Sequence, residues 1–434
     1  MKLNIPNKVM KVINKVHTSG FNLFIVGGSI RDLLLGKEPE DWDLATNMNL
    51  KDFAKLFAQE STMKSKYRVL KLHFMGIEFQ VAQLRSEGLY KDGRHPNYIK
   101  TGATVREDVK RRDFTINGIY YDAIKSEIID HVNGISDLKK KQIKTIGESS
   151  VRFSEDYLRI LRAIRFAGKL RFEIEKKTFN SILKLSKFVA KISGERVEHE
   201  ITAMLLSESA FESIELLGKS KILHNLFSEF SILPKFNSIF LKNLKSSKKK
   251  IKDASSTTNT LAWAIFLTCL YYSFDNTKQT SEIIANNSLM HDQISDLLKL
   301  KLKFNNRDRK QILIILENQI SFIKSNRREN KIWKKTLRKP FIFESLEFFR
   351  IMFSSNKNDL EIYNFWTDKL ENTKKKDFQP KKLIKGEDLI KLGFKKGPKI
   401  KIILKTVEEE QLEETIKNKK QALVFVKKKF IKKA

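Results

Sequence analysis

Residues 24–47 read FIVGGSIRDLLLGKEPEDWDLATN, and this stretch decides the fold of the first part of the chain. Its opening FIV is a β-branched and aromatic run, which predicts a short buried strand. Gly27 and Gly28 end that strand in a tight turn, and Ser29 can cap the helix that follows. A glycine and a proline further on end this helix. The stretch therefore predicts a strand, a glycine turn and a helix in close succession.

Two carboxylates follow on a second predicted strand of the same stretch, at Asp41 and Asp43. Strand side chains alternate between faces, so residues i and i+2 share one face and lie about 6–7 Å apart. Two ionised carboxylates this close repel each other unless a cation lies between them, and Mg²⁺ is commonly held by one or two carboxylates together with substrate phosphates. The free N–H groups of the glycine turn, at a helix N-terminus, suit a phosphate. A two-carboxylate metal site beside a phosphate-binding turn is what nucleotidyl transfer requires.

The ordered set Gly-Gly-x-x-Arg-Asp, Leu-Gly and Asp-x-Asp-x-x-Thr resembles the first motif of a known family. This family comprises the class II tRNA nucleotidyltransferases and the bacterial poly(A) polymerases, within the polymerase-β-like nucleotidyltransferases. The resemblance implies that Asp41 and Asp43 are catalytic and bind Mg²⁺. It implies nucleotide binding by the residues of the turn and its helix, Gly27, Gly28, Ser29, Arg31 and Asp32. Gln80 stands where this family usually has a third carboxylate, and an amide supplies no negative charge to a metal.

The composition points to a polyanionic partner. The chain has 84 Lys and Arg against 51 Asp and Glu among 434 residues, a formal net charge of +33, which favours nucleic acid. Its single cysteine, Cys269, excludes a disulfide framework and a cysteine-based zinc site, and it fits a reducing, cytoplasmic location. No signal peptide is visible. The longest apolar run, residues 261–272, predicts a buried helix because it is too short for a membrane span. No obligate protein partner is evident.

The segments around the first motif predict a mixed sheet with flanking helices. Residues 7–18 have apolar side chains at helical spacing, and residues 50–57 predict a second helix. Residues 67–74 and 76–84 predict paired strands, with a turn at Met75 and Gly76. This pattern predicts an α+β head.

Two later segments of the head resemble further family features. Residues 90–96, YKDGRHP, predict a loop and resemble the flexible loop that helps the family's enzymes switch between incoming nucleotides. An Arg-Arg-Asp cluster can contact triphosphate and ribose oxygens, since a guanidinium binds them bidentately and a carboxylate accepts from a hydroxyl. The order Arg-Arg-Asp-Phe-Thr-x-Asn at residues 111–117 resembles the second motif. The resemblance extends its nucleotide-binding role to Arg112, Asp113 and Asn117.

A stripe of charged residues marks the predicted neck helix, which begins at Ser154 as N-cap. The stripe consists of Asp156, Arg159, Arg162 and Arg165. By itself such a stripe could be an exposed, salt-bridged helix face. It resembles the family's Glu-Asp-x-x-Arg motif, whose Asp and Arg serve as a template for the incoming base. A carboxylate and a guanidinium match the amine and ring nitrogen that adenine and cytosine share. The two later arginines could reach the triphosphate.

The rest of the chain predicts helices with basic faces. Arg196 and Glu200, four residues apart, predict a structural pair in a segment that resembles the family's fifth motif. Serine and lysine runs at residues 246–259 predict a loop. Residues 383–423 resemble the family's C-terminal segment. Their lysine faces could track tRNA phosphates, or they could simply be solvated.

Together the motifs predict four parts: a nucleotidyltransferase head (1–145), a neck that recognises the base (146–210), a helical body (211–371) and a tRNA-binding tail (372–434). The expected activity is Mg²⁺-dependent addition of CCA to tRNA from CTP and ATP. Poly(A) polymerase is an alternative, although residues 71–76 lack the basic stretch usual in those enzymes. Partial A-adding or CC-adding enzymes, or a non-catalytic RNA-binding relative, are further alternatives.

Overall fold

The computed structural model describes residues 3–58, 62–66, 69–88, 96–228, 254–271, 288–324, 329–353 and 357–431. The chain divides into two compact units, Met1–Ser228 and Glu229–Ala434. The predicted loop at residues 90–96 lies outside the described residues except for its last position.

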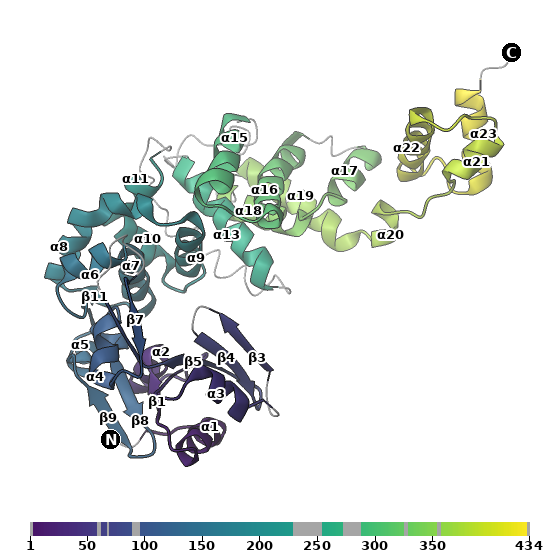
Figure 1. Ribbon diagram of the computed structural model, residues 1–434. Coiled ribbons are helices and arrows are strands. Elements are labelled where there is room, and N and C mark those ends of the chain that lie inside the picture. The colour runs from purple at the N-terminus through teal and green to yellow at the C-terminus, as the bar shows by residue number, and fades with distance from the viewer. Residues whose placement is uncertain are drawn as a thin grey trace. The chain divides into compact units, whose positions relative to one another are not determined.

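A seven-stranded sheet organises the first unit, in the order β3-β4-β5-β2-β1-β8-β9 (Figure 1). Its strands are β1 Leu23–Val26, β2 Trp42–Thr46, β3 Thr62–Lys66, β4 Val69–Phe74, β5 Ile77–Gln83, β8 Ile119–Asp122 and β9 Glu127–Asp130. All four residues of β1 are buried, and β1 pairs antiparallel with β2 and β8. Strands β2 and β5 pair in parallel, with Asp43 opposite Gln80. The catalytic candidates therefore lie near the centre of the sheet.

Short elements complete the head. Two-stranded sheets join β6 Arg85–Glu87 with β7 Ile99–Thr101 and β10 Gln142–Ile143 with β11 Glu173–Ile174. The helices of the head are α1 Asn7–Thr18, α2 Gly27–Leu34, α3 Leu50–Leu56, α4 Val105–Asp108 and α5 Gly134–Lys139. Short 3₁₀ turns lie at Val109–Arg111 and Thr115–Asn117.

Helix α1 shows why the predicted head elements form. Its apolar residues Val9, Val12, Ile13 and Val16 recur at helical spacing and are at most 1% exposed, so one face packs into the core. At its C-terminal part, Lys15 lies 5.0 Å from the ring of Phe57, which follows α3. The mixed sheet and these helices confirm the predicted α+β head.

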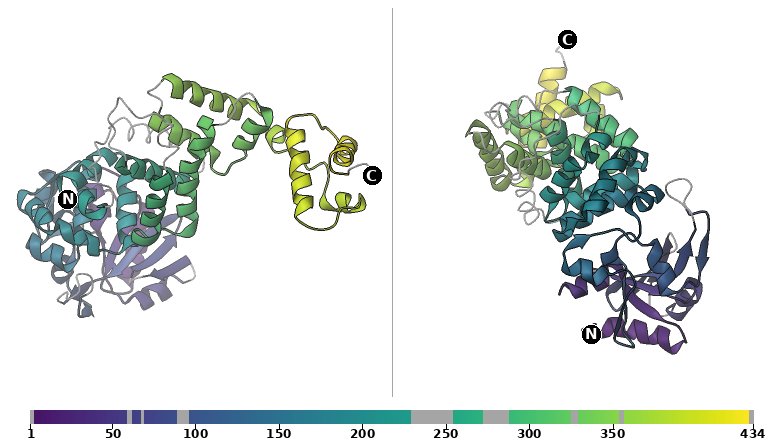
Figure 2. Two further views of the ribbon diagram at one scale, coloured as in Figure 1. Left: turned by 90° about the horizontal axis from the view of Figure 1, so that it is seen from above. Right: turned by 90° about the vertical axis from the view of Figure 1, so that its left-hand side faces the viewer.

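Six helices follow the head in the same unit and form a separate group in Figure 2. They are α6 Ser149–Glu155, α7 Leu158–Leu170, α8 Lys176–Leu185, α9 Gly194–Leu205, α10 Ala210–Lys219 and α11 Ile222–Leu226, with a 3₁₀ segment at Ser186–Lys191 after α8. The predicted N-cap at Ser154 is wrong, because Ser154 lies inside α6 and its hydroxyl donates to the Ser150 carbonyl. The helix is interrupted at Asp156, whose backbone is extended with a φ of −152°. The Asp156 carboxylate accepts a hydrogen bond from the Leu158 N–H at the start of α7.

The described part of the second unit is helical. Its helices are α13 Ala254–Tyr271, α15 Ser288–Asp296, α16 Asn306–Lys324, α17 Asn330–Leu337, α18 Ile342–Phe353, α19 Lys357–Asn372, α20 Lys375–Phe378, α21 Gly386–Lys391, α22 Pro398–Leu412 and α23 Lys419–Phe430, and a π-helical segment, Leu297–Lys301, follows α15. The loop predicted at residues 246–259 is wrong from residue 254 on, because the buried apolar run that follows extends its helix backwards through polar residues.

Charged side chains connect helices within this unit. Ion pairs join α17 to the segment around α22, Arg338 to Glu408 at 2.6 Å and Lys334 to Glu414 at 2.8 Å. Within the described residues, no helix has the length and apolar character that crossing a membrane requires.

Candidate active site

A cleft of about 750 Å³ in the first unit brings together elements distant in the sequence. It is lined by the turn between β1 and α2, by β2 and β5, by the segment after α4, and by α7 and α9. All residues predicted for the site except Ser29 line this cleft, namely Gly27, Gly28, Arg31, Asp32, Asp41, Asp43, Arg112, Asp113, Asn117, Asp156, Arg159, Arg162 and Arg165.

Ser29 is not the predicted helix cap. Helix α2 starts at Gly27, and Ser29 is 1% exposed within its first turn. The Ser29 hydroxyl accepts from the Asp43 N–H at 2.6 Å and donates to the Asp41 carbonyl at 3.1 Å. Ser29 therefore fastens the start of the helix to the backbone that carries both aspartates.

The glycine turn lies directly against the second aspartate. The Gly28 N–H donates to Oδ2 of Asp43 at 3.2 Å. Gly27 has φ +63°, and a Cβ there would lie 3.1 Å from the same oxygen, so a side chain would meet both backbone strain and the carboxylate. Burial raises the pKa of Asp43, and the charge of Asp41 raises it further, against the lowering effect of Gly28 and two arginines. The repulsion expected between the two carboxylates is therefore present, and a divalent cation would relieve it.

Gln80 contacts the first aspartate. Its amide nitrogen donates a hydrogen bond to Oδ2 of Asp41. Glu78, two residues before Gln80 on β5, pairs with Lys71 and lies 3.1 Å from His73. Within the described ranges, no group of three or more His, Cys, Asp or Glu side chains could hold a metal. The donor set that fits Mg²⁺ here is two carboxylates plus phosphate oxygens of a substrate.

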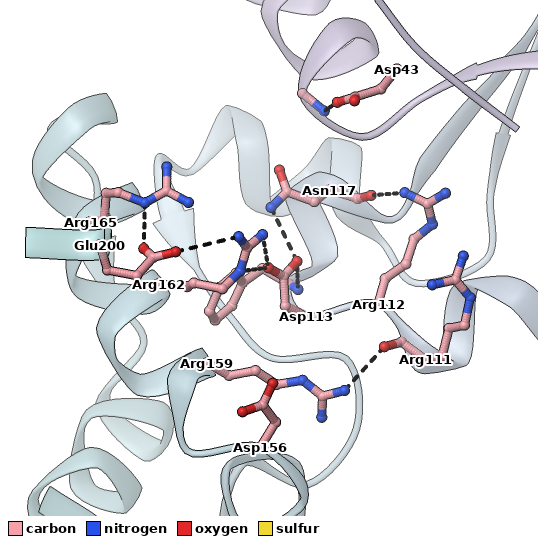
Figure 3. A network of polar contacts seen from close by, with 12 residues as sticks. Asp43, Arg111, Arg112, Asp113, Asn117, Asp156, Arg159, Arg162, Arg165 and Glu200 are labelled. Carbon is pink, nitrogen blue, oxygen red and sulfur yellow. Dashed lines mark hydrogen bonds and ion pairs between the residues drawn. The ribbon is translucent and has the colours of Figure 1, made fainter. Parts of the chain in front are cut away.

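Asp113 is the centre of a polar network in Figure 3. Arg162 donates to its Oδ2 through Nε at 2.8 Å and through a terminal nitrogen at 2.6 Å. Asn117 donates to Oδ1 at 3.2 Å, and the Asn117 amide oxygen accepts from Arg31 at 2.9 Å. The guanidinium groups of Arg31, Arg162 and Arg165 all lie 4.4 to 5.4 Å from the ring of Phe166. The network thus arranges three cations along the cleft.

The pKa of Asp113 supports a prediction on acid stability. Burial raises this pKa, but Arg162, Asn117 and the Phe114 N–H outweigh burial and lower the pKa to about 2. The carboxylate therefore stabilises the fold above the unfolded-state pKa near 3.9, by about 2 kcal/mol, and this stability is lost as the pH falls from about 4 to about 2. We expect Asp113→Asn to lose this part of the acid dependence, as measured by denaturant unfolding at pH 2 to 5. A constant difference from wild type across that range would contradict the assignment.

The base-template candidates have other partners in this structure. Asp156 accepts from both terminal nitrogens of Arg196, at 3.1 and 2.7 Å, and Arg159 donates to Glu155 at 2.6 Å. The predicted pair of Arg196 with Glu200 is wrong, because Glu200 instead accepts from Arg165 at 2.6 Å. Through Arg196 and Glu200, helix α9 therefore makes three ion pairs with α7 and with Asp156 just before it. Spacing within one helix does not reveal such a link between helices.

One buried carboxylate behind the cleft escaped the sequence analysis. Asp108 is fully buried and accepts from Arg111 at 2.8 Å and from Arg112 at 3.3 Å. Its position three and four residues before these arginines, in a segment that turns helically, was a signal that could have found it.

Models of known protein families match three successive parts of the chain. Residues 23–144 match the poly A polymerase head domain, residues 171–233 the probable RNA- and SrmB-binding site of polymerase A, and residues 272–426 tRNA nucleotidyltransferase domain 2. A CCA-adding enzyme of Lactococcus lactis subsp. cremoris (strain MG1363) is 30% identical over 97% of this chain and 95% of its own length. One from Streptococcus mutans is 34% identical over 62% of this chain and 65% of its own length.

Solved structures share the fold at lower identity. The Bacillus stearothermophilus CCA-adding enzyme in complex with CTP is 21% identical, with a TM-score of 0.68 over 97% of both chains. The Thermotoga maritima CCA-adding enzyme complexed with tRNA is 19% identical, with a TM-score of 0.59 over 97% of this chain and 95% of its own.

The polymerase-type head, with paired aspartates beside a glycine turn and a helical continuation, defines an RNA nucleotidyltransferase. The head alone is shared between poly(A) polymerases and tRNA nucleotidyltransferases, but the relatives reported above match along the whole chain or most of it. The chain belongs to the CCA-adding enzyme family.

Proposed function

We propose that this chain adds CCA to the 3′ ends of tRNA from CTP and ATP and releases pyrophosphate. The observation that carries the proposal is the cleft itself, where the aspartate pair, the glycine turn and the Asp156–Arg159 segment meet. Structural relatives in complex with CTP, ATP and tRNA support the choice of substrates.

Asp41 and Asp43 are proposed to hold Mg²⁺, which when bound stabilises developing negative charge and lowers the pKa of the primer hydroxyl. Gly28 presents its backbone at the helix N-terminus, where N–H groups and the helix dipole favour a phosphate. Arg31 and Arg112 supply cations on the same side of the cleft as this turn. These residues orient the triphosphate, and the two carboxylates face the reacting end.

Asp156 and Arg159 are proposed to read the base. A carboxylate accepts from the exocyclic amine that cytosine and adenine share, whereas uracil and guanine would present a carbonyl to it. Asp156 pairs with Arg196 of α9, and Arg159 pairs with Glu155 of α6. Those contacts limit the rotamers that each side chain can adopt, which favours a fixed template over an adaptable one.

The parts of the chain are proposed to divide the work. The head (1–145) carries the chemistry, the neck (146–210) reads the base, the body (211–371) connects them to the tail, and the tail (372–434) binds tRNA through its lysines. We also propose a cytoplasmic location. The support for this location is Cys269, a buried free thiol that forms no disulfide. Burial raises the pKa of this thiol to about 12.

One assay tests the function. The protein is incubated with tRNA lacking its terminal CCA and with each nucleoside triphosphate singly and together, and the product ends are sequenced. We expect CCA ends only when CTP and ATP are both present. Ends stopping at CC or a run of A would identify a CC-adding or a poly(A) activity instead. A parallel reaction with tRNA ending in CC covers the A-adding alternative: extension of that tRNA alone would identify it, and extension of neither tRNA would refute a catalytic role.

We expect tRNA binding to weaken steeply with salt, because lysine–phosphate contacts release counterions. Six such contacts would cost about 10³-fold in affinity between about 50 and about 200 mM salt. Filter binding over that range measures the slope, with thermal unfolding at each salt concentration as control for the ion pairs between α17 and the α22 segment. A flat response would contradict the basic tail as the RNA surface.

A further inference from the structure

Asp108 does not line the cleft, but it pairs with two arginines that do, Arg111 and Arg112. Asp108 ends α4 and is fully buried. Its Oδ1 accepts from the Arg85 N–H at 3.0 Å and from Nε of Arg111 at 2.9 Å. Its Oδ2 accepts from the Tyr120 hydroxyl at 2.5 Å and from Nε of Arg112 at 3.3 Å. Both oxygens of Asp108 are therefore committed to donors from four separate residues.

Arg112 is held from several sides at once. Its Nε also donates to the Tyr120 hydroxyl at 2.7 Å, and its guanidinium lies 4.8 Å from the Tyr120 ring centroid. A terminal nitrogen donates to the Asn117 carbonyl at 3.4 Å and lies 3.5 Å from where a Cβ on Gly27 would stand. The guanidinium of Arg112 thus reaches the glycine turn at the mouth of the phosphate site, while its inner edge faces Asp108 and Tyr120.

The charge of Asp108 matters for this arrangement. Burial raises the pKa of Asp108, but the two guanidinium groups, the Tyr120 hydroxyl and the Arg85 N–H outweigh burial and lower it. Asp108 is therefore ionised, and it offsets only one of the two positive charges on Arg111 and Arg112. The remaining positive charge faces the cleft in a fixed place, whereas an unsupported arginine would sample many rotamers.

We propose that Asp108 is a positioning residue for nucleotide binding: it fixes the Arg112 guanidinium where that group meets the triphosphate at the Gly27 turn. This inference rests on the proposed function, because it assumes that the cleft binds a nucleoside triphosphate. Tyr120 takes part as the hydroxyl that links the carboxylate to Nε of Arg112.

The experiment is a double-mutant cycle on nucleotide affinity. The dissociation constants of CTP and ATP are measured by calorimetry in Mg²⁺ buffer without tRNA, so that catalysis does not enter. We expect Asp108→Asn to raise both constants about tenfold, the range for a hydrogen bond to a charged group. In the Arg112→Ala background, the same change should raise them less than about twofold, because residues that act as one unit are not additive.

A matched control separates positioning from stability. Asp130 in the same unit also accepts three N–H groups, from Val132, Gly134 and Ile135, at 2.9 to 3.0 Å. Asp130→Asn should lower the melting temperature and leave both dissociation constants unchanged. If Asp108→Asn does not fold, Tyr120→Phe keeps the ring and the buried charge but removes the linking hydroxyl, and should raise the constants about threefold only when Arg112 is present.

The outcomes are distinct. Equal effects of Asp108→Asn with and without Arg112 would mean that Asp108 supports the fold in general, and this would overturn the proposal. Unchanged affinity in a folded Asp108→Asn protein would overturn it as well, and so would unchanged affinity in Tyr120→Phe if that variant has to replace it. Failure of the wild-type chain to bind either nucleotide would instead refute the proposed function itself.

Discussion

Asp43→Asn should abolish nucleotide addition while leaving tRNA binding near normal. We expect the rate of CMP incorporation into tRNA lacking CCA to fall by at least about 10³-fold, since metal-borne charge stabilisation is worth several kcal/mol in the transition state. Asn keeps the size of the side chain and one acceptor oxygen for the Gly28 N–H. The loss would therefore report the missing negative charge and not a collapsed turn. Single-turnover incorporation measures the rate, and filter binding measures the affinity for tRNA.

Glu78→Gln is the matched control for this result. Glu78 lies on β5, two residues before Gln80, but its carboxylate is engaged by Lys71 and does not line the cleft. Removing its charge should change the rate of incorporation less than about twofold. Turnover by Asp43→Asn close to that of wild type would refute Asp43 as a metal ligand. A loss as large in the control would mean that incorporation responds to any acidic group on this part of the sheet.

Arg159→Ala should blur the selection of nucleotides. A good bidentate contact to a base is worth roughly 1–3 kcal/mol of discrimination. We therefore expect the preference for CTP and ATP over UTP and GTP to fall by about 5- to 150-fold. The change also removes donors to the Arg152 carbonyl and to Glu155, so thermal unfolding must accompany the measurement. The quantity to compare is the ratio of kcat/KM values for the four nucleotides, which cancels a uniform loss of active protein.

Arg165→Ala is the matched control on the same helix. Arg165 also lines the cleft and has a carboxylate partner, Glu200, yet it is proposed to serve the triphosphate and not the base. Its removal should raise the KM of all four nucleotides by a similar factor and leave their ratios unchanged. Unchanged ratios in Arg159→Ala would move base reading to another residue, and changed ratios in Arg165→Ala would assign it a part in that reading.

Local sequence patterns were sufficient for the elements around the cleft. Helix α1 was predicted with its observed bounds, and the turn at Met75 and Gly76 has the positive φ angles, +51° and +78°, that such a tight turn requires. The prediction failed at Ser154 because the helical spacing continues through the break. Asp156 leaves helical geometry, and the second helix, α7, begins at Leu158 and carries all three arginines of the stripe.

For the site, too, sequence patterns predicted some features and failed to predict others. Spacing predicted Asp41 and Asp43 on one face of a strand, although the strand itself begins at Trp42, directly after Asp41. The order of motifs along the chain added the Arg-Arg-Asp cluster and the neck stripe to the same site. These sequence patterns could not predict which charged groups contact one another in the folded protein. Glu200, which holds Arg165, is fixed by a contact between separate helices, and the Gln80 amide on Asp41 likewise joins separate segments. Asp108 differs, because it lies only three and four residues before the arginines that it holds.

The sequence by itself determined the elements and the family, because a strand, a glycine turn and a helix follow from the preferences of residues that are neighbours along the chain. The tertiary structure decided the pairing of charges: Arg162 with Asp113, Arg196 with Asp156, and Arg165 with Glu200. All three pairs join residues that are at least 35 positions apart in the sequence. A charged side chain in a partly buried cleft takes whichever partner packing brings within reach, and only the folded chain brings these partners together.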